Sequence, residues 1–183
     1  MGDPKKKHKR FTTPKLPFDQ AGLEEELKLL GAYGLRNKKE LWRLRTQLSR
    51  FRRMARETQS MDPVERAEGE RQMLRKLYGM GLVGEKSTVD DILSLRIEDL
   101  LERRLQTVVF RREMAKSFFQ ARQFVTHGHV SIGGRKVKSP SYWVTAEDEG
   151  LIEFTESSSL SNAGHPLRRE LAVRDSMGGE RAE

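Results

Sequence analysis

The clearest pattern in the chain is a helical repeat of apolar residues between positions 38 and 58. Successive members lie three or four residues apart, so they share one face of a helix with 3.6 residues per turn. Asn37, just before the repeat, is a favourable N-cap. The pattern therefore predicts an amphipathic helix from Lys38 to Thr58. Its apolar residues are Leu41, Leu44, Leu48, Phe51 and Ala55.

Shorter helical patterns flank this segment. The first begins at Ala21 and ends near Gly31 and Gly34, since glycines commonly mark helix ends. Asp62 and Pro63 indicate another helix start, with Asp as the N-cap and Pro at the first helical position. The predicted helices are Ala21–Leu30, Pro63–Tyr78, a short segment from Ser87 to Leu95, and a single helix from Glu98 to Arg112.

The pattern changes from helical to mixed after Lys116. Ser117 and Gln120 have the spacing of a capping box, which opens a helix that ends near His127. Val130–Ile132 alternates like a strand, and Gly133-Gly134 suits a two-residue hairpin turn because glycine tolerates positive φ. The returning strand is 135–138, and further candidate strands are 142–144 and 151–154. The fold class predicted is α+β and mostly helical.

Composition narrows the class of protein. The chain has 183 residues, of which 36% are hydrophobic and 34% charged, so it has room for a modest core and a large polar surface. There is no cysteine, which excludes disulfides, thiolate metal sites and a cysteine nucleophile. No apolar run reaches the ~18–20 residues that span a bilayer, and we expect no membrane association.

Charge is distributed in alternating blocks. Residues 1–60 carry 16 basic and 7 acidic side chains, and 103–144 carry 9 and 1. The intervening block 61–102 carries 6 and 10, and the last block 145–183 carries 4 and 9. Clustered cations release condensed counterions when they meet phosphates, so this segregation favours a polyanion binder over two solvated helix faces.

The long helix carries the first candidate binding face. Its cations repeat on the side opposite the apolar stripe, and along the helix no acid interrupts them there, so forked guanidinium donors would face phosphate oxygens. Trp42 lies among them and either stacks on a base or packs against a neighbouring helix. The candidate RNA-binding residues here are Lys38, Arg43, Arg45, Arg50, Arg52, Arg53 and Arg56.

A second candidate face lies on the following helices and hairpin. The helix from Ser117 is mostly apolar, which favours recognition of shape and backbone over reading of base edges. Its candidate RNA-binding residues are Arg103, Arg104, Arg111, Arg112, Lys116, Ser117, Arg122, Gln123, His127, His129, Arg135, Lys136 and Lys138.

Catalytic and metal chemistry find little support. The glycines match neither nucleotide-binding fingerprint, and no Ser, His and Asp are placed together by sequence. His127 and His129 lack a nearby carboxylate or thiol, and the acidic pairs suit helix starts and turns. We therefore expect no catalytic residues, no metal, no cofactor and no small-molecule substrate.

The segment RRLQTVVFRREMAKSFFQARQFVTHGHVSIGGRKVKSPSYWV resembles the RNA-binding module named after ribosomal protein S4. Upstream, LKLLGAYGLRNKKELWRLR, FRRMAR, MLRKLYGMGLV and IEDLLERRLQT resemble the archaeal and eukaryotic branch of the ribosomal protein S4 family. The resemblance covers about residues 9–154, and the short chain with its acidic C-terminal extension favours the archaeal type. The zinc knuckle of some bacterial relatives is absent.

Composition and the resemblance together predict four regions, of which composition supplies the two tails, and the resemblance implies a function. The regions are a basic tail 1–20, a helical domain 21–102, an S4-type module 103–155 of two helices with a β-hairpin or small sheet, and an acidic, flexible tail 156–183. Members of the family are cytoplasmic structural constituents of the small ribosomal subunit. They bind 16S rRNA directly, nucleate assembly of the subunit body, and contribute to translational accuracy beside ribosomal proteins S5 and S3 near the mRNA entrance.

Two other functions remain open at this point. The module also occurs as an anchor in RNA-modifying enzymes and translation-associated factors, which would need a catalytic domain. A DNA-binding helix-turn-helix regulator is the second alternative, and it would bind duplex DNA as tightly as junction RNA.

Overall fold

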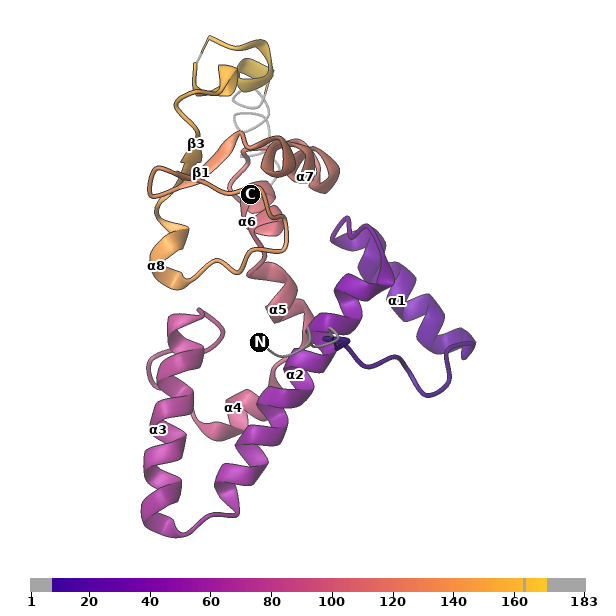
Figure 1. Ribbon diagram of the computed structural model, residues 1–183, viewed down its shortest axis with the longest axis vertical. Coiled ribbons are helices and arrows are strands. Elements are labelled where there is room, and N and C mark those ends of the chain that lie inside the picture. Colours follow the sequence, from indigo (N-terminus) through magenta and orange to yellow (C-terminus); the bar gives the residue numbers. More distant parts are fainter. Residues whose placement is uncertain (1–7, 163, 171–183) are drawn as a thin grey trace, which may run out of the picture.

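The computed structural model describes residues 8–162 and 164–170, and the chain forms a helical half followed by a small α+β module (Figure 1). The helical half contains α1 Gln20–Ala32, α2 Lys38–Gln59, α3 Pro63–Gly79, α4 Val89–Ser94 and α5 Ile97–Glu102. The module contains α6 Leu105–Arg111, α7 Phe118–His127, β1 Val130–Ile132, β2 Arg135–Lys136, α8 Ala146–Glu149, β3 Ile152–Phe154 and the 3₁₀ turn η1 Ser159–Ser161. The predicted α+β, mostly helical class is confirmed.

The long helix α2 organises the helical half. It begins where the sequence predicts, because the Asn37 side chain accepts a hydrogen bond from the Glu40 backbone N–H at 3.2 Å. Its predicted apolar stripe is buried from Leu41 to Ala55. Figure 1 shows α2 and α3 meeting at one end of the molecule and diverging, with α4 between them and α1 beside the start of α2.

The module has its own core beneath a three-stranded antiparallel sheet of order β2-β1-β3. Helices α6 and α7 pack on each other, and Val109, Val125 and Val130 are fully buried in this second core. The turn prediction is confirmed, since Gly133 and Gly134 have φ of 53° and 77°, as a primed hairpin turn requires. The returning strand is shorter than expected and ends at Lys136.

The single helix expected from Glu98 to Arg112 is wrong. It is broken at Arg103 and Arg104, where Arg104 is extended, with φ −79° and ψ 139°, and forms an isolated β-bridge to Trp143. The Leu105 backbone N–H donates to the Tyr142 carbonyl at 2.9 Å, so the loop after the hairpin replaces the helical hydrogen bonds. The candidate strand 142–144 does not form; only Trp143 takes part in this isolated bridge.

Two smaller differences concern helix ends. Pro63 begins α3 as predicted, but the Asp62 side chain makes no capping hydrogen bond. The acidic residues 147–149, which suit a helix start or a solvated turn, lie in the short helix α8, which Thr145 caps by accepting from the Asp148 backbone N–H at 3.1 Å.

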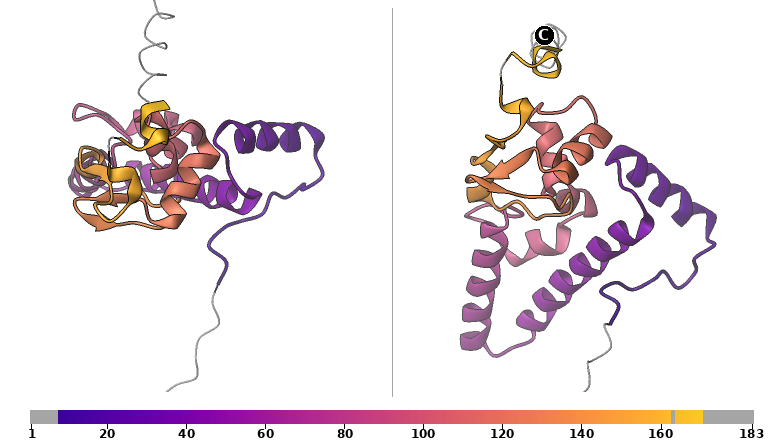
Figure 2. Two further views of the ribbon diagram at one scale, coloured as in Figure 1. Left: turned by 90° about the horizontal axis from the view of Figure 1, so that it is seen from above. Right: turned by 45° about the horizontal axis from the view of Figure 1, so that its top comes forward.

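Both terminal segments contact the body of the protein over the residues described. Phe11 lies 5.9 Å from the Trp42 ring, and the Thr12 backbone N–H donates to Thr46 Oγ1 at 3.0 Å. At the other end Leu160 is buried and Leu167 packs on the module core. Figure 2 shows the first segment passing beside α2 and the last lying beyond the sheet. Of the two predicted tails, residues 1–7, 163 and 171–183 lie outside the described residues.

Candidate nucleic-acid interface

A buried acid lies beneath the start of the α2 cationic face. Glu26 of α1 is 3% exposed. Its carboxylate lies 3.2 Å from Lys38 Nζ and 2.8 Å from Arg45 Nη1. Two of the predicted face's cations are thus engaged by an acid from a different helix, which the periodicity of α2 cannot show.

Trp42 belongs to the same cluster. Its Nε1–H donates to Glu26 Oε1 at 2.9 Å, and its ring packs near Phe11. Of the two roles left open by the sequence, the structure supports packing against a neighbouring helix. Trp42 is half-buried in this position.

Two further cations of α2 are engaged within the protein. Arg52 Nη2 donates to the Leu95 carbonyl at 2.6 Å, which ties α2 to the end of α4. Arg53 Nε lies 2.7 Å from Glu57 Oε1, one turn further along the helix. By contrast, Arg43, Arg50 and Arg56 are exposed, and none has an ion-pair partner within the part of the chain that the structure describes.

A shared carboxylate joins the helical half to the module. Glu40 of α2 lies 2.5 Å from Arg104 Nη2 and 2.8 Å from Arg122 Nη2. Burial tends to raise the pKa of Glu40, but the hydrogen bond from Arg122 and the two positive charges outweigh it, so the pKa lies below its ordinary value. We name these three side chains the Glu40 cluster.

The amide of Gln106 extends the Glu40 cluster into the backbone. Its Oε1 accepts from Arg122 Nη1 at 3.2 Å, and its Nε2 donates to the carbonyls of Gly34 and Phe118, both at 3.0 Å. Arg104 is only 3% exposed, so the structure corrects its assignment as a surface RNA-binding residue. Sequence reasoning missed Glu40 and Gln106 because the partners of Glu40 lie 64 or more residues away and those of Gln106 lie 12 or more residues away.

Other cations of the module pair with acids at its edges. Arg111 donates to both carboxylate oxygens of Glu102, at 3.1 and 2.8 Å, and Arg103 Nη1 lies 2.5 Å from Glu149. Lys116 forms an ion pair with Glu170 near the end of the described chain.

Glu102 carries a second contact from the helical half. The Tyr33 hydroxyl donates to Glu102 Oε1 at 3.0 Å. Burial and the nearby carboxylate raise the pKa of Tyr33 to about 12.

The outer side of the hairpin is the most accessible basic surface of the module. Arg135, Lys136 and Lys138 are exposed there, with His127 and Gln123 exposed on α7 beside them. The start of α7, the helix that carries Gln123 and His127, is fixed by a cap: the Ser117 side chain accepts a hydrogen bond from the Gln120 backbone N–H at 3.2 Å.

Gly128, in the left-handed conformation, ends α7 close to the aliphatic parts of the Lys136 and Lys138 side chains. It has φ +77°, and a Cβ built on it would lie 2.9 Å from Lys136 Cδ and 3.2 Å from Lys138 Cε. Close by, His129 Nδ1 contacts Ser158 Oγ at 2.8 Å, so His129 is half-buried against the C-terminal segment.

A groove of about 620 Å³ runs between α2 and the loop that precedes α8. We call it the interdomain groove. Among the described residues that line it, cations outnumber acids: Arg43 and Arg50 come from α2, Lys76 from α3, Arg10 from the N-terminal segment, and the one acid is Glu40. Trp143 of the module is part of the wall, and the module's lining cation, Arg104, is buried. A phosphate-bearing ligand in this groove would therefore meet accessible cations of the helical half.

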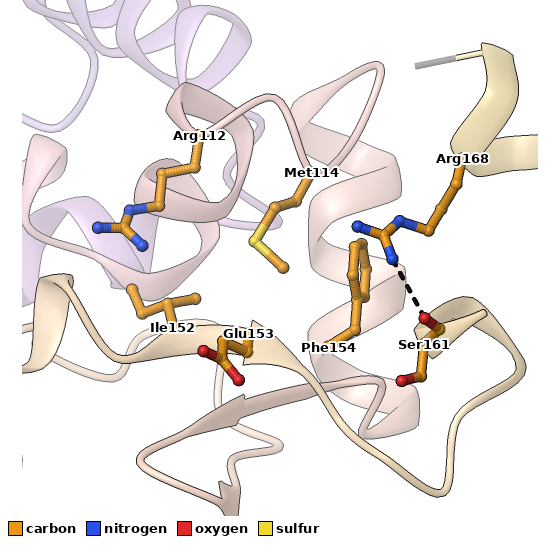
Figure 3. A pocket seen from close by; sticks show the side chains of 7 residues that line it. All are labelled: Arg112, Met114, Ile152, Glu153, Phe154, Ser161 and Arg168. Carbon is orange, nitrogen blue, oxygen red and sulfur yellow. Dashed lines mark hydrogen bonds between the residues drawn. The ribbon is translucent and has the colours of Figure 1, made fainter. Parts of the chain in front are cut away.

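A second cavity lies on the far side of the module and involves no residue grouping evident in the sequence (Figure 3). It measures about 530 Å³ and is lined by Arg112, Met114, Ile152, Glu153, Phe154, Ser161 and Arg168. Arg168 lies 5.2 Å from the Phe154 ring centroid and donates to the Ser161 carbonyl at 3.1 Å. Arg112 thus shares this cavity with β3 and the C-terminal segment, and none of the hairpin cations lines it.

Within 8–162 and 164–170, no three His, Asp or Glu side chains gather as a metal site would require. No helix in the described ranges is both long and apolar enough to cross a membrane.

Comparison with known proteins agrees with this architecture. Residues 2–102 match the ribosomal protein S4/S9 N-terminal domain, and residues 103–149 match the S4 domain. The small ribosomal subunit protein uS4 of Metallosphaera sedula is 48% identical over 163 residues, which cover 88% of this chain and 91% of that protein. The uS4 proteins of Ignicoccus hospitalis and Thermoplasma acidophilum are 49% and 41% identical, covering 86% and 100% of this chain and 95% and 94% of theirs. The resemblance found in the sequence is confirmed: the chain belongs to the uS4 family of small ribosomal subunit proteins.

Proposed function

We propose that the protein is a structural component of the cytoplasmic small ribosomal subunit that binds 16S rRNA directly. The observation that carries the proposal is the presence of two accessible cationic surfaces, one on each half of the protein. One is the interdomain groove with Arg43 and Arg50, and the other is the hairpin with Arg135, Lys136 and Lys138. Membership of the uS4 family supports the identity of the RNA.

The two surfaces suit folded RNA better than a regular duplex. They belong to different halves of the protein, and the Glu40 cluster holds these halves together at 2.5 and 2.8 Å. A ligand that touches both therefore needs phosphates at two separated, fixed positions, which a helical junction in folded RNA can provide. The exposed groups are mostly cations that hold backbone rather than amides that read base edges.

From this binding mode follows a role in assembly. A protein that bridges RNA helices before other components arrive stabilises their junction, and we propose that this chain nucleates the subunit body in that way. The proposal includes a contribution to translational accuracy, contacts with ribosomal proteins S5 and S3, and a position near the mRNA entrance. It assigns the protein no catalytic step.

The test is RNA binding at a series of salt concentrations, using 16S rRNA transcribed in vitro. The double variant Arg43→Gln, Arg50→Gln removes two exposed groove cations and should lose roughly 1 kcal/mol or more per phosphate contact. The slope of log affinity against log salt should fall by about 0.7–0.9 per contact.

A matched control removes the same charge elsewhere. Arg71→Gln, Arg75→Gln changes two exposed arginines of α3 that do not line the interdomain groove, and it should bind like the parent protein. Equal loss in both double variants would mean that only net charge matters. A parent protein that binds duplex DNA as tightly as 16S rRNA would contradict the proposal and favour a DNA-binding regulator.

A further inference from the structure

An exposed aromatic ring stands at the first turn of α7, where the two halves meet. Phe119 is 67% exposed, whereas its neighbour Phe118 turns inward and lies 4.1 Å from Phe110 and 6.0 Å from Tyr33, ring centroid to centroid. Phe118 therefore supplies the packing at this point of α7, and packing does not account for Phe119. Its ring shares a pocket with Arg36 and Arg122, and an exposed aromatic face beside cations suits a nucleic-acid ligand.

The surroundings of Phe119 define a shallow pocket of about 350 Å³. Its floor includes Gly34, and its walls come from Arg36 in the loop between α1 and α2 and from Gln123 and Thr126 of α7. Phe119, Gln123 and Thr126 are three or four residues apart and so share one face of the helix. No carboxylate lines the pocket.

Gly34 explains how the two halves come close enough to share this pocket. Its φ is +56°, and a Cβ built there would lie 2.6 Å from Phe118 Cβ, which is closer than side-chain atoms can approach. The loop that carries Arg36 therefore lies directly against the start of α7. The Glu40 cluster and Gln106 hold it there through Arg122 and the Gly34 carbonyl.

We propose that Phe119 stacks on an unpaired base of the bound RNA. Aromatic rings bind unstacked bases through their faces, and Arg36 places a cation beside the ring for the adjoining phosphate. The Gln123 amide can both donate to and accept from a base edge. The cation, the ring and the amide together fit a single-stranded nucleotide extruded from the junction. This inference rests on the proposed function and adds to it a residue and a nucleotide class.

The experiment compares Phe119→Ala with Phe119→Tyr in binding to 16S rRNA across a salt series. Loss of a stacked base weakens binding about 5- to 150-fold at each salt concentration, while the salt slope stays that of the parent, because no charge is removed. Phe119→Tyr keeps the ring and should bind like the parent. Thermal melts should show no loss of stability in Phe119→Ala, since the ring is mostly in solvent.

Phe18→Ala is the matched control, because that ring is 91% exposed but lies before α1 and lines none of the pockets described above. Chemical probing provides a second readout: the parent should protect an unpaired nucleotide that becomes reactive with Phe119→Ala.

Parent-like affinity and protection with Phe119→Ala would overturn the inference and assign the ring to a protein contact. The groove variants would still weaken binding in that case, so the proposed function would stand. If the parent itself bound no 16S rRNA, both proposals would be wrong.

Discussion

The α2 face and the hairpin face are both strongly basic in sequence, yet they differ in the structure. On α2, Lys38 and Arg45 lie on a buried carboxylate, and Arg52 donates to a backbone carbonyl. On the hairpin, Arg135, Lys136 and Lys138 are exposed, and none of them forms an ion pair within the described part of the chain. A row of cations on a helix can therefore serve to hold a neighbouring helix, and only the members left unpaired remain available for RNA.

The largest effect expected from breaking this arrangement is on stability. Glu40→Gln removes the shared negative charge and leaves Arg104 buried without a counter-ion. Removing one partner of a buried ion pair typically costs about 3–5 kcal/mol. Chemical denaturation of the variant should show a loss of that size in the free energy of unfolding.

Glu57→Gln is the control for that loss. It breaks an exposed pair with Arg53 on the same helix and should change stability by about 1 kcal/mol or less. If Glu40→Gln were as mild as Glu57→Gln, the Glu40 cluster would not be holding the two halves together.

A second, smaller contrast uses two arginines, one from each face. Arg45→Gln removes a charged hydrogen bond to buried Glu26 and should cost about 1.5–3 kcal/mol of stability. Arg135→Gln removes an exposed cation, so the melting temperature should stay the same while the salt slope of RNA binding becomes shallower by about 0.7–0.9. The measurements are the melting temperature and the salt slope of RNA binding for each of the two variants. If both variants lost RNA affinity with unchanged stability, the two faces would be alike.

The smallest effect expected is on the acid side of the stability profile. The pKa of Glu40 is lower in the folded protein than its ordinary value, so the unfolded chain binds more protons as pH falls. The contribution of Glu40 is complete above the unfolded pKa and is lost as pH falls through the folded one. Glu40→Gln should therefore show a flatter loss of stability below about pH 5 than the parent. If the stability of the variant and of the parent fell equally steeply with pH below about pH 5, Glu40 would not be ionised in the cluster as described.

The elements predicted correctly from sequence are those whose signals are local. Asn37 caps α2, the glycine pair makes the hairpin turn, and the Ser117 side chain caps α7, as their spacings indicate. Each depends on residues within four positions, where backbone geometry limits the choices.

Most failures involve partners distant in sequence; the pairing of Arg53 with Glu57 and the missing Asp62 cap are local exceptions. The break at Arg104 is made by Trp143, which lies in the loop after the hairpin, and the pairing of Arg45 depends on Glu26 in the preceding helix. Periodicity within one helix carries no information about either partner. The same reason hid the cavity between Arg112 and Arg168, whose walls join residues 56 positions apart.

The Glu40 cluster also limits how far the module can be treated as a portable unit. The boundary between the two matched families falls at residues 102 and 103, just before Arg104. A fragment cut there would keep Arg104 and Arg122 but lose the only carboxylate that the structure places against them. Such a fragment would carry two like charges facing each other at its newly exposed edge. The module of this chain is therefore adapted to its own helical half, and transplanting it would require a new acid in the recipient.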